Sequence, residues 1–435
     1  MTDCKQTVWT FPTVKSKKVT ADFGGGDITS SAGALLLRQA DRKIGLTREA
    51  ARLIPDERCP GKIEHTIEAM LRQRVYAIAS GEEDLNDHHQ LRNDPALQAA
   101  VDRTDVLASA STLCRFENAA NRRLAGALQS LFVEQFIASH KNAPGQIILD
   151  FDATDDAVHG RQEGRFFHGY YDRYCFLPLY VFCGSQLLCA YLRPSKIDGA
   201  KHAWAILSLL VKRLRKQWPN VQIIFRGDSG FCRWKMLRWC DNHGVDYIVG
   251  LAKNKRLTSR GAEQMEQAKS TFEATHEKQR LFGELSYAAG TWDRQRRVIM
   301  KAEHSIMGSN PRFIVTSLCD DPQELYDAIY CARGDMENRI KEQQLNLFAD
   351  RTSCHQWWAN QFRLLLSSMA YILFDTIRRL GLKGTELARA TCGTIRLKLI
   401  RIGAVVLRNT RRIRLHMSSS HPHQDIFALV VRRLE

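Results

Sequence analysis

Runs of apolar residues separated by polar connections predict alternating strands and helices in the middle of the chain. Short runs rich in β-branched and aromatic residues predict strands at 147–152, 174–183 and 186–192. The last two are separated by Gly184-Ser185, which favours a hairpin. Apolar residues at helical spacing predict a crossover helix over 202–217, before a further strand that ends at Asp228. A helix over 235–242 and a strand over 247–251 complete this order.

The flanking regions have different patterns, and together they predict four segments. Residues 30–135 show helical spacing, so residues 1–140 are expected to form a mostly helical domain. A polar stretch and two strand-like runs after residue 253 predict a β-rich insertion. The four segments expected are 1–140, a core made of 141–253 and 312–350, the insertion 254–311, and a basic, mainly helical C-terminal region 351–435. Within that last region a helix is expected over 385–402 and a strand pair near 405 and 413.

Two of the predicted strands end in acid. Asp152 and Asp228 each follow an apolar run, and a buried carboxylate is costly unless a cation or hydrogen bonds compensate it. Carboxylate oxygens suit Mg²⁺ or Mn²⁺. Asp150 competes with Asp152, because residues two apart on a strand share one face. Spacing alone leaves both open, and Asp228 before Ser229 is equally compatible with a local turn.

A third carboxylate belongs to a predicted helix. At about 100° per residue, the side chains of Tyr330, Arg333, Glu337 and Lys341 fall within one arc of that helix. A hydroxyl, a guanidinium, a carboxylate and an ammonium group would then share one face. The alternative is a solvated helix with a Glu337–Lys341 pair that contributes a few tenths of a kcal/mol.

The positive net charge of the chain predicts a polyanionic partner. The formal net charge is +16, and residues 351–435 alone carry 15 basic and 4 acidic side chains, a net of +11. Such asymmetry favours nucleic acid, whose binding would depend strongly on salt. A membrane partner is not expected, because lipidation motifs and a basic amphipathic anchor are missing and no apolar stretch approaches ~20 residues.

The cysteines predict neither disulfides nor a zinc site. All 12 are scattered without a CxxC pair, as in a protein with free thiols in a reducing compartment. The first residues lack the order of a signal peptide. A cytoplasmic protein is therefore expected.

These motifs together resemble a known family. The Y-x2-R-x3-E spacing at 330–337, preceded by Asp152-Ala-Thr and by Arg226-Gly-Asp-Ser-Gly-Phe, is similar to the DDE transposases of bacterial insertion sequences. The similarity covers most of the chain, including segments between Ser30 and Asn118, so residues 1–140 are expected to bind DNA. It also implies a bacterial protein associated with the nucleoid. It implies an α/β fold with a ribonuclease-H-like, retroviral-integrase-like catalytic core interrupted by the insertion, and the order of predicted elements fits such a core.

The resemblance also implies roles for residues. Asp152, Asp228 and Glu337 would be the catalytic carboxylates and hold two Mg²⁺ ions, for which Mn²⁺ may substitute, about 3.5 to 4 Å apart. Tyr330, Arg333 and Lys341 would contact DNA, and Trp292 in the insertion would stack on an unpaired base. A packing role for Trp292 is the alternative. The family pattern expects a Lys where this chain has Gln344.

The activity implied is cut-and-paste transposition. Metal-dependent cleavage of the ends of the element would be followed by strand transfer into target DNA. The partners would be double-stranded transposon ends and target, bound by a homodimer in a synaptic complex. Two alternatives stay open, namely a ribonuclease-H-like endonuclease without strand transfer and a catalytically inactive DNA-binding relative.

Overall fold

The computed structural model describes residues 7–435 and divides them into two compact units. The first unit contains the chain up to Ala120 together with Asn346–Phe348 and Met369–Glu435. The second unit contains Asn121–Leu345 and Ala349–Ser368. This division differs from the four segments expected from sequence, because residues 121–138 group with the predicted core and the C-terminal region is shared between both units. Every helix within the described range is too short or too polar to cross a membrane.

The first unit is mainly helical. Its N-terminal helices are α1 (Ala34–Ile44), α2 (Leu46–Leu53), η1 (Pro60–Lys62), α3 (Ile67–Ser80), η2 (Leu85–Asp87), α4 (His88–Leu91), α5 (Pro95–Ala100) and α6 (Ala110–Asn118). Its C-terminal helices are η6 (Ile377–Gly381), α15 (Cys392–Ile395), η7 (Arg396–Ile400) and α16 (Gln424–Leu434). Its strands are β1 (Trp9–Val14), β2 (Lys17–Ala21), β3 (Ile28–Thr29), β16 (Ala404–Asn409) and β17 (Arg412–Met417). The strand pair β16–β17 confirms the prediction near residues 405 and 413, and β3 adds to it. The helix expected over 385–402 is shorter and begins only at Cys392.

The second unit is built on a nine-stranded mixed sheet. Its central strands are β4 (Gln146–Ala153), β8 (Leu179–Cys183), β9 (Gln186–Tyr191), β10 (Gln222–Gly227), β11 (Asp246–Leu251) and β15 (Arg312–Thr316). The sheet continues through β12 (Gln279–Tyr287), β13 (Arg296–Ser305) and β14 (Gly308–Ser309). The strand order is β12-β13-β15-β11-β10-β4-β8-β9, with β14 paired to β13. A small second sheet contains β5 (Asp156–Ala157), β6 (Phe166–His168) and β7 (Arg173–Phe176).

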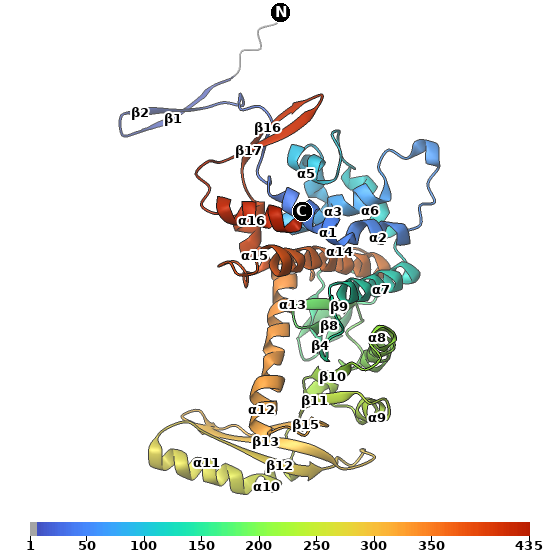
Figure 1. The fold of residues 1–435 in the computed structure, drawn as a ribbon, viewed down its shortest axis with the longest axis vertical. Coiled ribbons are helices and arrows are strands. Elements are labelled where there is room, and N and C mark those ends of the chain that lie inside the picture. The colour runs from blue at the N-terminus through green and yellow to red at the C-terminus, as the bar shows by residue number, and fades with distance from the viewer. Residues whose placement is uncertain (1–6) are drawn as a thin grey trace, which may run out of the picture. The chain divides into compact units, whose positions relative to one another are not determined.

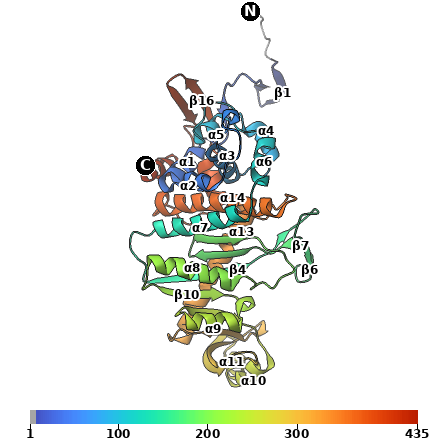
Figure 2. The same ribbon diagram turned by 90° about the vertical axis from the view of Figure 1, so that its right-hand side faces the viewer.

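Helices cover both faces of the large sheet. The helices α7 (Arg122–Ala138), α8 (Ala203–Gln217) and α9 (Trp234–Asn242) contribute side chains to the larger core cluster, together with alternate residues of β4 and β10 such as Phe151 and Phe225. The opposite face carries Ile224, Ile248 and Ile314 beneath Leu325 and Tyr326. In Figure 1 the α12–α13 run lies on the other side of the central strands from α8 and α9, and Figure 2 shows α7, α8 and α9 toward the viewer.

Most predicted elements of this unit are confirmed, and two are not. The single strand expected over 174–183 is two strands in different sheets, because Leu177 and Pro178 separate them and proline cannot donate to a ladder. The segment expected as a β-rich insertion also contains α10 (Lys255–Arg260) and α11 (Ala262–Thr275). Its strands β12 and β13 extend the core sheet through β15, so they are continuous with the core.

The helical run that bears Glu337 is irregular. It consists of α12 (Pro322–Glu324), a π-helical turn η4 (Leu325–Tyr330), a short η5 (Cys331–Arg333) and α13 (Gly334–Leu347). A further helix, α14 (Trp357–Thr376), is strongly apolar. Single π-turns inside helices often occur at functional sites. This one lies immediately before the residues of the predicted acidic site.

Candidate active site

The parallel pairing of β4 with β10 brings the two aspartates together. Ile148 pairs with Ile224, Asp150 with Arg226, and Phe151 with Gly227 along the two strands. One step further in this register, Asp152 lies opposite Asp228. The first and fourth strands of the core therefore lie side by side.

Asp150 and Asp152 share a face of β4 but have different surroundings. Asp150 is buried and accepts two hydrogen bonds from the Arg226 guanidinium, one of them at 2.7 Å between Nη2 and Oδ2. The third branch of Arg226 donates to the backbone oxygen of Ile329, in the π-turn. Burial raises the pKa of Asp150, and the Arg226 charge and hydrogen bond oppose that rise. Asp150 therefore fixes the position of Arg226, and Arg226 links the helical run to the sheet.

Asp152 and Glu337 face the same guanidinium. Nη2 of Arg333 donates to Oε1 of Glu337, one turn later, and Nη1 of Arg333 lies 3.7 Å from Oδ2 of Asp152. Glu337 lies in the first turn of α13, where the helix dipole favours a negative charge. Its side chain is 43% exposed, whereas that of Asp152 is 17% exposed. The solvated Glu337–Lys341 pair considered from sequence is not formed among the described residues.

The pKa of Asp152 shows that the three carboxylates interact. Burial, with the negative charges of Asp228 and Glu337, raises this pKa to about 7, although Arg333 and the backbone N–H of Ala153 oppose the rise. The pKa of Arg333 is raised despite its burial, because Asp152, Glu337 and Asp228 all stabilise its charge. Arg333 is thus the common cationic partner of the acidic cluster.

Asp228 also makes a local turn. Its Oδ1 accepts a hydrogen bond from the Gly230 N–H at 2.9 Å, so the turn considered from sequence is present. The turn opens the short helix η3 (Ser229–Phe231). It orients the carboxylate at the end of β10 and occupies only one side of it.

Divalent cations fit the chemistry of this cluster. Among residues 7–435, no three His, Cys, Asp or Glu side chains are arranged closely enough to hold a metal ion. The donor set is nevertheless of oxygen type, and the only cation that contacts Asp152 and Glu337 among the described residues is Arg333. Arg333 occupies the position between Asp152 and Glu337 that a cation shared by them would take.

Tyr330 packs against the turn that carries Asp228. A Cβ atom added to Gly250 of β11 would lie 2.6 Å from the Tyr330 hydroxyl and 2.7 Å from the Ser229 nitrogen. The absence of a side chain at Gly250 therefore allows β11, the Asp228 turn and the π-turn to approach. Burial raises the pKa of Tyr330, which keeps the hydroxyl protonated and able to donate.

Lys341 and Gln344 lie further along α13. Lys341 is exposed and makes no ion pair among the described residues. Gln344 donates from Nε2 to the Asp155 backbone oxygen at 3.1 Å and to Oδ1 of Asp156 at 2.9 Å. Asp156 is fully buried, and burial raises its pKa well above the usual range. Gln344 therefore gives the buried Asp156 a hydrogen-bond donor without a positive charge, and this hydrogen bond opposes the rise in the pKa that burial causes.

Trp292 takes part in packing. Its ring lies 5.7 Å from that of Tyr287 in an edge-to-face arrangement, and the Arg296 guanidinium lies 5.5 Å from its centroid. The neighbouring arginines are paired with acids, as in the Arg294–Asp241 bridge at 2.7 Å. The base-stacking role stays a prediction, and the surroundings favour the packing alternative.

Three residues of this region were not selected from the sequence. Arg226 and Gly250 are described above. Tyr171 lies between β6 and β7, and burial with the charges of Asp155 and Asp152 raises its pKa to about 12. The sequence could have indicated Arg226, because Arg226 precedes Asp228 by two residues, just as Asp150 precedes Asp152. No sequence pattern indicated Tyr171 or Gly250, because contacts between residues far apart in the chain bring them to this region.

Comparison with known proteins gives a family match. The family model described as "Transposase DDE domain group 1" matches residues 11–435. No curated protein matches the chain. Among solved structures, one match is titled "Cryo-EM structure of piggyBac transposase synaptic complex with hairpin DNA (SNHP)", with 11% identity, 94% of this chain and 82% of that chain covered, and a TM-score of 0.43.

Proposed function

This chain belongs to the family of transposases with a DDE domain, and we propose that Asp152, Asp228 and Glu337 carry out its chemistry. It is an enzyme that acts on DNA, and such transposases use divalent metal ions. The observation that supports the assignment is that Arg333 bonds to Glu337 and lies 3.7 Å from Asp152, while Asp228 follows the strand that pairs with the strand of Asp152.

The reaction proposed is cut-and-paste transposition of a bacterial insertion sequence. An oxygen nucleophile, water for cleavage or a 3′-hydroxyl for joining, attacks phosphorus as the leaving 3′-oxygen departs on the opposite side. Mg²⁺ ions, replaceable by Mn²⁺, would be held by Asp152, Asp228 and Glu337 and would activate the nucleophile and stabilise the leaving oxygen. No covalent bond to the protein is needed.

Arg333 has two tasks in this proposal. Before metal and DNA bind, it compensates the charge of Asp152 and Glu337. With cations bound, the guanidinium is released from Glu337 and can make a two-pronged contact with a phosphate oxygen pair. Tyr330, held beside the Asp228 turn, would donate a hydrogen bond from its hydroxyl to a phosphate oxygen of the same DNA strand.

Strand order supports a ribonuclease-H-like core. Along β9-β8-β4-β10-β11 the strands are the third, second, first, fourth and fifth of the core in chain order. The pairs β4–β8 and β8–β9 are antiparallel, whereas β4–β10 and β10–β11 are parallel. This arrangement leaves the carboxyl ends of β4, β10 and β11 at one edge, where Asp152 and Asp228 lie.

The DNA partner would be held as two transposon ends plus target, by a homodimer. The net charge of +16 supports binding to DNA in general. Lys341 is proposed as a phosphate contact because it is exposed and unpaired on α13 among the described residues.

The replacement Asp228→Asn tests the proposed chemistry. We expect it to abolish metal-dependent cleavage of the DNA that flanks the gene, because one oxygen ligand loses its charge, while DNA binding stays within about twofold of the wild type. Cleavage is measured on labelled DNA with Mg²⁺ or Mn²⁺, and binding by anisotropy. Asp327→Asn, in the helical run that bears Glu337 and paired with Arg280, serves as the control with the same change of residue type.

The outcomes also separate the alternatives. Joined product from a precut end identifies a transposase, whereas cleavage without joining identifies an endonuclease. A wild-type protein that binds DNA but neither cuts nor joins with any divalent ion would be an inactive relative. Normal cleavage by Asp228→Asn would refute the site.

A further inference from the structure

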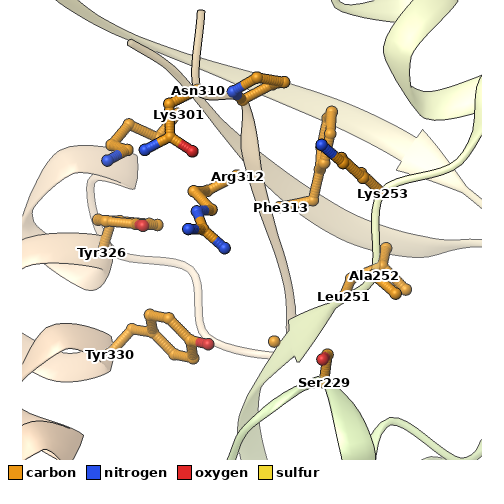
Figure 3. A pocket seen from close by; sticks show the side chains of 12 residues that line it. Ser229, Leu251, Ala252, Lys253, Lys301, Asn310, Arg312, Phe313, Tyr326 and Tyr330 are labelled. Carbon is orange, nitrogen blue, oxygen red and sulfur yellow. The ribbon is translucent and has the colours of Figure 1, made fainter. Parts of the chain in front are cut away.

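A cavity of about 650 Å³ opens beside the carboxylate cluster in the second unit. Its walls come from the end of β11, the start of β15, the strand β13 and the π-turn. The lining residues on which the argument depends are Ser229, Lys253, Lys301, Arg312, Tyr326 and Tyr330 (Figure 3). This volume is within the range of small-molecule sites, roughly 300 to 1,000 Å³.

Sheet topology places this cavity at the acidic edge. β15 runs antiparallel to β11, with Gly250 opposite Ile314 and Leu251 opposite Phe313. The first residue of β15, Arg312, is therefore at the edge where β11 ends. Ser229 follows Asp228 directly and lines the cavity, so the cavity and the carboxylate cluster are adjacent.

Two of the three cations in the wall have no acidic partner. Lys301 is buried and bonded to Oε2 of Glu303 at 3.0 Å, and Glu303 also accepts from Lys278 and Asn310. Lys253 and Arg312 are exposed, and neither makes an ion pair or side-chain hydrogen bond among the described residues. The cavity therefore keeps an uncompensated positive charge of about two.

Neutral donors complete the lining. Figure 3 shows the Arg312 guanidinium and the Tyr330 hydroxyl directed into one space, with Ser229 across from Tyr330. Guanidinium, ammonium and hydroxyl groups together are donors for phosphate oxygens. The ring of Tyr326 is almost fully buried against Phe282 and Tyr330, so it supports the wall and is not free to stack on a base.

We propose that this cavity binds a backbone phosphate of the DNA strand next to the phosphate that is cleaved, with Lys253 and Arg312 as its charged ligands. The inference rests on the proposed function, because it assumes that the strand reaches Asp228. A phosphate held here fixes the register of the strand relative to the carboxylates. A free phosphate compound is the other source of the same chemistry.

Salt dependence of DNA binding tests the proposal without any cleavage. The double variant Lys253→Gln/Arg312→Gln is compared with Lys212→Gln/Lys216→Gln, which removes the same charge from α8 on the opposite face of the sheet. The probe is a fluorescein-labelled duplex of random sequence. Each phosphate contact contributes about 0.9 to the slope of log K against log salt, so losing the one phosphate held in the cavity should lower that slope by about 1. Equal slope changes in both variants would overturn the proposal.

A second measurement locates the phosphate. Once the cut is mapped, single neutral methylphosphonates are placed at successive positions around it. In the wild type, one position should weaken binding, and in the cavity variant that same position should have no further effect. Additive losses at every position would contradict a dedicated phosphate site.

Inorganic pyrophosphate separates the two sources of anion. If the cavity serves DNA, pyrophosphate at millimolar concentration competes weakly. Micromolar binding of pyrophosphate that is lost in the cavity variant, with an unchanged DNA slope, would assign the cavity to a free anion and overturn the proposal. Normal cleavage by Asp228→Asn would refute the catalytic site alone, because the slopes still report on the cavity.

Discussion

Strand β4 carries an aspartate at an inner position, Asp150, and another at an outer position, Asp152, and the two have different surroundings. At the inner position, Asp150 is enclosed with Arg226, which makes hydrogen bonds to both of its oxygens. At the outer position, Asp152 shares Arg333 with Glu337 at a distance of 3.7 Å. The strand register gives Asp150 its own cation, whereas Asp152 competes with two other acids for one.

The contrast between Asp150 and Asp152 shows how a ligand-binding carboxylate cluster differs from a structural ion pair. A buried pair with satisfied hydrogen bonds has no capacity left for a ligand. In the outer cluster Asp152 and Glu337 share one guanidinium, so carboxylate oxygens remain available to a ligand. The surplus of acid over cation, more than burial alone, marks the outer position.

The largest effect should come from replacing the outer aspartate. We expect Asp152→Asn to reduce cleavage below detection, because a charged ligand is lost, while the unfolding free energy changes by less than about 1 kcal/mol. Product formation on labelled DNA and urea unfolding measure the two quantities. Full activity in this variant would remove the distinction between the two positions.

Replacing the inner aspartate should instead destabilise the protein. Asp150→Ala leaves Arg226 buried without its partner, which costs about 3 to 5 kcal/mol. The double variant Asp150→Leu/Arg226→Met should recover most of that loss, because it removes both charges. Urea unfolding of the three proteins checks this, and an Asp150→Ala protein as stable as the wild type would show that the pair does not hold the π-turn.

A methyl group between the sheet and the π-turn should move the site without changing its charges. In Gly250→Ala the new Cβ would be 2.6 Å from the Tyr330 hydroxyl and 3.1 Å from the Asp228 carbonyl carbon. A displacement near 1 Å lowers the rate about a hundredfold. Gly290→Ala, where the added Cβ would meet nothing within 4 Å, is the control. Equal cleavage rates for the two variants would show that the site tolerates this shift.

A third aspartate, Asp156, should affect only the pH dependence of stability. Burial holds the pKa of Asp156 well above its usual range, so above about pH 4 the unfolded chain ionises this group while the folded chain does not. Stability then falls as pH rises, by about 1.4 kcal/mol per pH unit while the folded carboxyl stays protonated. Asp156→Asn keeps the acceptor for Gln344 and should lessen that fall in urea unfolding between pH 4 and 7. Identical pH profiles would mean that Asp156 is ionised in the folded protein.

Sequence patterns predicted much of the second unit because its strands are short apolar runs with clear boundaries. The strand of Asp152, its neighbour ending at Asp228 and the helices α8 and α9 follow from periodicity. The boundary between β7 and β8 was missed, because the apolar run continues from one strand into the next. The helices of the insertion were missed because their polar surfaces carry a weak apolar stripe.

The sequence by itself determined the order of elements, the basic charge and the acidic residues at the strand ends, because these depend on local composition and spacing. It left Asp150 and Asp152 equivalent, since both lie on one face of a strand. Tertiary structure decided between their surroundings through the register of β4 with β10, which places Arg226 beside Asp150. It also created the cavity of Lys253 and Arg312, because residues about 60 apart meet only when β15 pairs with β11.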